Sequence, residues 1–253
     1  YIFYKINLIF LYIKLYIKKI GASNMDSLTF LVENREIIKL FYGLLIGLIC
    51  FVIVSRVDKL FRLSLHQGIR YFRNAFVFYG IAFIVRYVFG YLIYFSYISW
   101  DYFNAVTLIF KYFLIMAGFF LLYSLIWKKI ENQKENYRSS LLNPRIVIFY
   151  AMSFLIIFLD YFWKTHHFIF ISQIILFTIT SGISLSNFVR GKKSHKFLKF
   201  YFIIMILSLM AWILNSIAAL FEWNPIIIMT VSGINVITFL LFLYGVLYHY
   251  LAI

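Results

Sequence analysis

Seven long apolar runs, separated by short charged loops, constrain the fold of this chain more than any other feature of its sequence. Each run is close to the about 20 residues that an α-helix needs to cross a bilayer. The runs lack the period-two alternation of a membrane β-barrel strand, which excludes that class. We therefore predict an all-α fold, a bundle of seven transmembrane helices. These helices should cover residues 37–55, 74–98, 103–127, 145–163, 167–189, 198–221 and 225–251.

The composition agrees with a location in lipid. Of the 253 residues, 64% are hydrophobic and 13% are charged, whereas about 25% of the residues in a soluble domain are charged. A chain with so little polar material cannot cover its own surface in water. We expect a multi-pass protein of a prokaryotic cell membrane, in contact with the lipid bilayer. The single cysteine, Cys50, cannot form an internal disulfide.

The distribution of basic residues predicts the orientation. The three loops on one side carry fifteen Lys and Arg residues, and the opposite side carries three. Loops rich in Lys and Arg stay in the cytoplasm, so we predict an N-terminus outside and a C-terminus inside. The net charge of +15 then belongs to these loops, and we expect no nucleic-acid partner. The fifteen residues are Arg56, Lys59, Arg62, Arg70, Arg73, Lys128, Lys129, Lys134, Arg138, Arg145, Arg190, Lys192, Lys193, Lys196 and Lys199.

Residues 1–24 are interpreted apart from the membrane domain, which we place at residues 25–253. An eighth helix over the apolar part of this segment would put several lysines on the outer side. Lys18 and Lys19 also lie where a signal peptide needs a small, uncharged cleavage region. We expect residues 1–24 to be upstream sequence translated in frame before Met25, or a disordered or peripheral segment.

A weak internal similarity relates the first three runs to the last three. A short segment that ends in a basic residue follows a basic loop in both triplets, at 71–73 and at 197–199. Parallel repeats of membrane helices occur in transporters, so the similarity predicts a 3+1+3 arrangement. Shared apolar and aromatic composition explains the same matches. Both interpretations stay open at this point.

Three ionisable residues lie within the runs, where charge is costly and marks either a functional site or a buried ion pair. Arg86 is near the middle of the second run, and Lys111 and Asp160 are in the outer halves of the third and fourth. Because Lys111 and Asp160 both lie in the outer half of the membrane, we predict that they form an ion pair. The alternatives are that Lys111 extends to the interface and that Asp160 pairs locally with Lys164.

Arg86 should face the bundle interior, because Ala82 and Gly90 lie one turn away on either side and small residues mark close helix packing. We expect Arg86 to be bonded to Asn235, to Ser208 or to backbone carbonyls, or to face an anionic ligand. Gly43 and Gly47 form a further small-residue pair, which we assign to helix packing.

The later runs carry uncharged polar residues on single helical faces. Hydrogen bonding between helices is the common explanation of such residues, and a polar pocket in the outer half of the membrane is the functional one. The candidate ligand-binding residues are Arg86, Lys111, Asp160, Gln173, Trp212, Asn215 and Asn235.

The sequence lacks the patterns of several chemistries. No run carries the paired His, Glu or Cys residues of a zinc or haem site, and no nucleotide-binding or hydrolase motif occurs. The topology resembles that of microbial rhodopsins, but the last run has no lysine for a retinal Schiff base. We expect no cofactor, no metal and no enzymatic activity.

Two functions fit these observations. The first is a sensor that binds a small anionic or lipid-like ligand in the outer-half pocket and signals through a separate cytoplasmic protein. The second is a small transporter or exporter of an anionic substrate. Few prolines and unbroken helices favour the sensor, and the internal similarity favours the transporter.

Overall fold

The computed structural model describes residues 34–64, 67–130, 144–163, 167–190, 196–220 and 225–251. Their contacts divide the chain into two units, residues 1–39 and 40–253. The regular elements in the described ranges are all helical, as predicted. The segment 1–24, with our interpretation of it, lies outside the described residues.

The helices coincide with the predicted runs in position but differ from them at several ends. Six of them are long and apolar enough to cross a membrane, counting the second run as one span, and the apolar part of the fourth run is shorter. The chain is therefore a multi-pass membrane protein by the length and composition of its helices. The elements are α3 (Arg35–Ser64), α4 (Gln67–Ile84), η1 (Val85–Phe89), α5 (Gly90–Tyr94), α6 (Tyr102–Ile130), α7 (Pro144–Phe162), α8 (His167–Arg190), α9 (Lys196–Leu220) and α10 (Pro225–Leu251).

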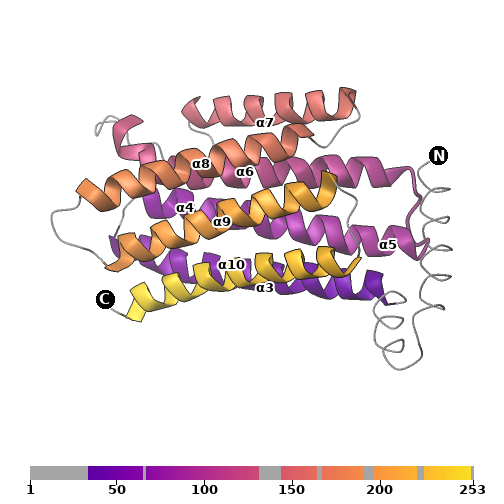
Figure 1. Cartoon of the computed structure of the whole chain (residues 1–253), viewed down its shortest axis with the longest axis horizontal. Helices are drawn as coiled ribbons and strands as arrows, with labels where there is room; N and C mark the ends of the chain where they lie inside the picture. The colour runs from indigo at the N-terminus through magenta and orange to yellow at the C-terminus, as the bar shows by residue number, and fades with distance from the viewer. Residues whose placement is uncertain are drawn as a thin grey trace. The chain divides into compact units, whose positions relative to one another are not determined.

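Helix α6 is the centre of packing in the unit 40–253. It lies against α4, α7 and α8, and α9 lies between α8 and α10. Every residue from 114 to 123 is buried, so α6 is covered on all sides over almost three turns. Helix α7 lies at the edge, next to α6 and α8 (Figure 1).

Aromatic side chains fill the contact between α4 and α10. Phe76 and Phe83 meet the ring of Phe239 edge-on, at centroid distances of 6.2 and 5.6 Å. Phe76 also meets Phe242 at 5.1 Å. Edge-to-face geometry is favourable because the positive edge of one ring meets the negative face of the other. These contacts give the two helices a specific register, which aliphatic side chains alone would define less sharply.

The first two helices extend beyond their apolar runs. The prediction ended the first helix at 55 and began the second at 74, whereas α3 ends at Ser64 and α4 begins at Gln67. Apolarity marks the part of a helix in hydrocarbon, but charged residues continue a helix readily. On the added turns, Arg62 donates to Asp58 four residues earlier at 3.1 Å.

The second run is not a regular α-helix, which corrects the expectation of unbroken helices. Residues Val85–Phe89 form a π-helical segment, η1, and the helix then ends at Tyr94 instead of 98. Ser96 has a φ of 61°, and the amide of Tyr97 donates to the Leu92 carbonyl at 2.9 Å. A left-handed residue with this hydrogen bond is the usual way to stop a helix, although glycine is the common choice there.

Candidate functional site

Arg86 is the second residue of η1 and contacts one face of α6. Its Nη1 donates to Thr107 Oγ1 at 2.7 Å, and its Cζ lies 5.1 Å from the ring centroid of Phe103 and 5.9 Å from that of Phe110. The three α6 residues are spaced by four and three positions, so they share one helical face. Both rings are within the range of a cation–π interaction.

The hydroxyl of Thr107 serves Arg86 as an acceptor. Thr107 Oγ1 donates its own proton to the Phe103 carbonyl at 2.9 Å, which leaves the oxygen lone pairs for the guanidinium. A neutral hydroxyl and two aromatic faces therefore hold the half-buried Arg86 against α6. Of the expected partners of Arg86, Asn235 bonds to Asn215, and Ser208 donates to the Ile204 carbonyl of its own helix.

Arg86 lies nearer the C-terminal end of its helix than predicted. Tyr94 ends α5 eight residues after Arg86, which is about 12 Å at 1.5 Å per residue. Lys111 lies nine residues after the start of α6 at Tyr102, or about 14 Å. The sequence prediction had Arg86 near the midplane because it placed this helix at 74–98. The two cations instead lie at similar distances from these two helix ends.

The small neighbours of Arg86 do not both mark close packing. Ala82 is fully buried, but a Cβ added at Gly90 would meet open space. A π-helical turn adds a residue to the helix, so positions on either side of it no longer follow the α-helical spacing. The glycine pair of α3 behaves as expected: a Cβ at Gly47 would lie 2.9 Å from Ile84, and one at Gly43 would overlap Tyr87.

Lys111 and Asp160 form an ion pair between α6 and α7, which confirms the prediction. The side chain of Lys111 is 9% exposed and that of Asp160 is 1% exposed. Burying either charge alone would be costly, so each requires the other. Ser153 Oγ also donates to the Met116 sulfur at 3.1 Å across the same two helices. Lys164, the alternative partner, lies outside the described residues.

Gln173 on α8 is fully buried against α6. Its Nε2 donates to the Leu114 carbonyl at 3.2 Å, and a Cβ at Gly118 would lie 2.9 Å from its Oε1. That oxygen has no hydrogen-bond partner among the described residues. Gly118 therefore provides the space that Gln173 occupies between the helices.

Asn215 and Asn235 form a two-way amide pair between α9 and α10. Asn215 Nδ2 donates to Asn235 Oδ1 at 2.9 Å, and Asn235 Nδ2 donates back at 3.2 Å. Asn235 Nδ2 also lies 3.4 Å from the Tyr42 hydroxyl of α3. This network connects three helices, as expected for polar residues that associate helices in lipid.

Trp212 packs within an aromatic group between α8 and α9. Its ring centroid is 6.4 Å from those of Phe170 and Phe177. The structure thus unites two pairs from the candidate set, Lys111 with Asp160 and Asn215 with Asn235. Arg86, Gln173 and Trp212 have the separate contacts described above, and their role in a ligand site stays a prediction.

Sequence reasoning missed several partners of the candidate residues. Phe103 and Phe110 share the face of Thr107, so the helical spacing around Thr107 could have indicated them. Tyr42 gave no such signal, because its contact with Asn235 joins residues 193 positions apart. Only the packing of α3 on α10 could reveal it.

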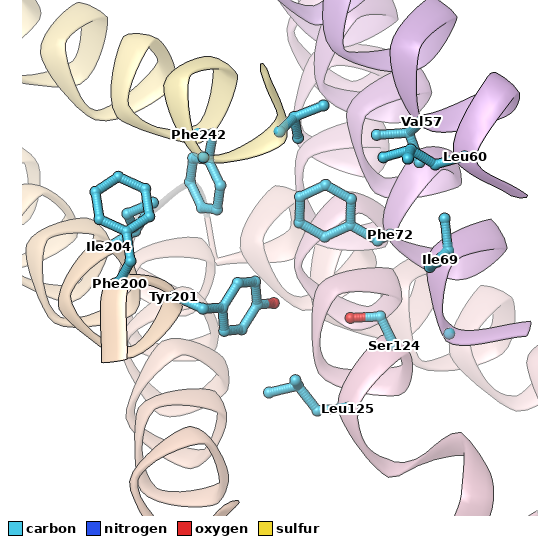
Figure 2. Close-up of a pocket in the computed structure, with 13 residues that line it drawn as sticks. Val57, Leu60, Ile69, Phe72, Ser124, Leu125, Phe200, Tyr201, Ile204 and Phe242 are labelled. Atoms are coloured by element: carbon cyan, nitrogen blue, oxygen red, sulfur yellow. The ribbon is translucent and has the colours of Figure 1, made fainter. Parts of the chain in front are cut away.

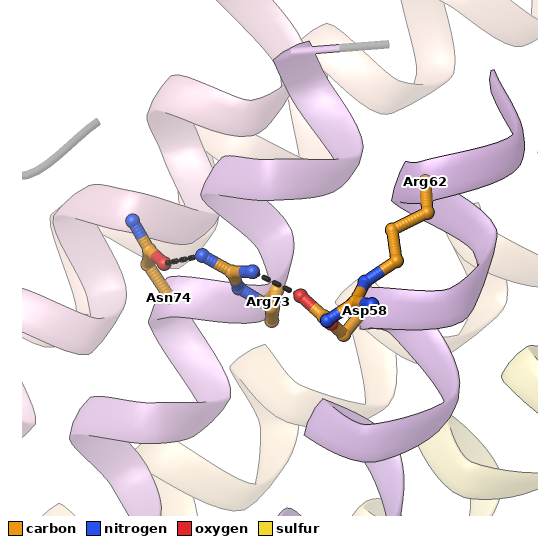
Figure 3. Close-up of polar contacts among 4 residues, drawn as sticks. All are labelled: Asp58, Arg62, Arg73 and Asn74. Atoms are coloured by element: carbon orange, nitrogen blue, oxygen red, sulfur yellow. Dashed lines mark hydrogen bonds and ion pairs between the residues drawn. The ribbon is translucent and has the colours of Figure 1, made fainter. Parts of the chain in front are cut away.

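A polar cluster between the C-terminal part of α3 and the N-terminal part of α4 was also missed. Asp58 of α3 pairs with Arg73 of α4 and with Arg62 on its own helix (Figure 3). The Arg73 side chain is 24% exposed, whereas that of Arg62 is 79% exposed. Arg73 Nη2 donates to Asn74 Oδ1 at 3.3 Å. Asp58 escaped notice because the prediction ended the first helix before it.

The described residues contain no group of three or more His, Cys, Asp or Glu side chains placed to hold a metal ion. No family model matches the chain, and no solved structure matches it. The chain is 32% identical over 98 residues to a protein of Archaeoglobus fulgidus described as uncharacterized. The aligned part covers 36% of this chain and 43% of that protein, which is less than half of each.

Proposed function

We propose that the chain is a seven-spanning membrane sensor with its N-terminal end outside and its C-terminal end in the cytoplasm. In this proposal α7 is the seventh span. Its 19 residues measure about 28 Å at 1.5 Å per residue, close to the about 30 Å of hydrocarbon. The Lys111–Asp160 pair supports this assignment, because it sets α7 beside α6 at the depth of Lys111.

The proposed ligand is a small anionic or lipid-like molecule bound at Arg86. The observation that carries this proposal is that the cation Arg86 lies within the π-helical segment η1. Ionisable residues at membrane depth are functional by default, and π-helical turns are frequent at functional sites. Phe103 and Phe110 would contact the apolar part of an amphiphilic ligand.

The signal would pass to a separate cytoplasmic protein. Exposed basic residues occur where this proposal places the cytoplasm, at Lys59 and Arg62 of α3 and at Lys199 of α9. They would suit an acidic partner surface. A binding protein, not an enzyme, is proposed because the sequence lacks the catalytic motifs noted above.

Transport of an anionic substrate is the second candidate, and η1 is the observation that favours it. Irregular helices at membrane depth are common where transporters bind their substrates. The sequence similarity between the first and last three runs would suit this function as well. Because η1 interrupts the second run, unbroken helices no longer favour the sensor over the transporter.

Cysteine labelling tests the proposed orientation. In a Cys50→Ser background, Glu135→Cys and Ser194→Cys should be protected from impermeant thiol reagents in intact cells, and Asp101→Cys should react. Reaction at 135 or 194 in sealed cells would reverse the orientation.

Ligand binding is tested with the protein in phosphatidylcholine nanodiscs and a panel of acetate, octanoate, phosphate and citrate. At least one anion should raise the melting temperature of the wild type, and Arg86→Gln should remove that shift. Arg62→Gln, which removes an exposed arginine, is the matched control and should keep it. Equal shifts in wild type and Arg86→Gln would refute the site. Uptake of the stabilising anion into proteoliposomes would favour the transporter.

A further inference from the structure

A cavity of about 200 Å³ lies between α3, α4, α6, α9 and α10, away from Arg86. Leu60, Phe72, Ile204 and Phe242 contribute to its largely apolar wall (Figure 2). Tyr201 and Ser124 bring hydroxyl groups to it, and these point toward one another in Figure 2. The Ser124 hydroxyl donates to the Leu121 carbonyl at 2.6 Å. An aliphatic or aromatic group would therefore match this wall.

The cavity suits part of a hydrocarbon chain by its size. An apolar cavity of about 150 Å³ stays dry and admits benzene, whereas drug-sized ligands occupy about 300–1,000 Å³. A volume of about 200 Å³ accommodates several methylene groups. Since the surrounding helices are apolar enough to lie in a bilayer, lipid acyl chains are the abundant source of such groups.

Basic residues lie at the same depth as the cavity on three of its helices. Lys59 is next to Leu60, Arg70 is next to Ile69, and Lys199 is next to Phe200; the second residue of each pair lines the cavity. Neighbouring residues differ by about 1.5 Å along a helix axis. Lys59 and Lys199 are exposed, so their ammonium groups can reach a ligand at the protein surface.

We propose that this cavity binds an acyl chain of an anionic phospholipid, whose headgroup lies against Lys59 and Lys199. The apolar wall selects the chain, and the basic residues select a negative headgroup over a zwitterionic one. Basic pockets between membrane helices bind acidic lipid headgroups by the same physics. This site is independent of the ligand proposed at Arg86.

Photolabelling in nanodiscs tests the proposal. The probe is phosphatidylglycerol with a diazirine in mid-chain, present at a few per cent in phosphatidylcholine, and adducts are located by mass spectrometry. Adducts should concentrate on the cavity residues of α4, α9 and α10. Ile204→Phe fills the cavity and should lower this labelling severalfold. Ile203→Phe is the matched control, because Ile203 is 43% exposed on the outer face of the same helix.

Further arms separate the two parts of the site. A phosphatidylcholine probe with the same chain should label the cavity severalfold less, and Lys59→Gln with Lys199→Gln should reduce phosphatidylglycerol labelling to that level. Arg86→Gln should change nothing here. If Ile204→Phe does not fold, Ser124→Leu replaces it as the variant that fills the cavity, from the opposite wall. Equal labelling by the two headgroups, or unchanged labelling in the filled variant, would overturn the proposal.

Discussion

The Lys111–Asp160 pair allows the sharpest test of the structure. Lys111→Met and Asp160→Asn each remove one charge and leave its partner almost fully buried between α6 and α7. The double variant removes both charges, so no uncompensated group remains. The two single variants should therefore be less stable than the double variant, an order that two independent residues would not produce.

The expected magnitudes follow from burial. A charge left alone at membrane depth costs about 2.5–3.5 kcal/mol on insertion scales, so each single variant should lose about 3 kcal/mol. A lost polar contact between membrane helices averages about 0.6 kcal/mol, so the double variant should lose about 1 kcal/mol. At about 2–4 °C per kcal/mol for a chain of this size, the melting temperature falls by about 6–12 °C in the single variants and about 2–4 °C in the double.

Thermal unfolding in one detergent, followed by tryptophan fluorescence, measures these shifts. Asp101→Asn is the control carboxylate, since Asp101 is exposed and accepts a hydrogen bond from Ser99. It lies about 15 Å from Lys111 along the chain, so its combination with Lys111→Met should be additive. If Lys111→Met and Asp160→Asn also add, the pair contributes no coupling and the reasoning is refuted.

The same unfolding measurement checks three further predictions. Gly43→Ala should lower the melting temperature by several degrees, because the added Cβ overlaps the side chain of Tyr87. Gly182→Ala adds a Cβ in open space and should raise the free energy of unfolding by about 0.5–1 kcal/mol. Equal effects of the two substitutions would contradict the packing. Asn235→Leu should cost about 1 kcal/mol through its lost interhelical bonds, and a neutral result would show that the network is dispensable. Arg73→Gln should lower the free energy of unfolding by about 1.5 kcal/mol, and the exposed Arg62→Gln should lower it by less than about 0.5 kcal/mol. The reverse order would show that Arg62, and not Arg73, is the stronger partner of Asp58.

The candidate site was predictable only where depth was the deciding variable. Lys111 and Asp160 could be paired from the sequence, because distance from a helix end converts directly into membrane depth. Arg86 could be recognised as a cation within an apolar run, but neither its partner Thr107 nor its distance from the helix end could be predicted. Both depend on the π-helical segment and on the early end of the helix before Ser96. Neither feature can be recognised from the apolar run.

By itself, the sequence determined that the chain is all-helical and which stretches form its long apolar helices, because the bilayer requires long apolar runs whose backbone bonds are satisfied internally. Tertiary packing decided which helix faces meet. The Asn215–Asn235–Tyr42 network, the Asp58–Arg73 pair and the cavity beside Tyr201 each depend on contacts between helices far apart in the chain. In a chain that is apolar on nearly every face, periodicity carries little information about such contacts, and side-chain shape and scattered hydrogen bonds decide them instead.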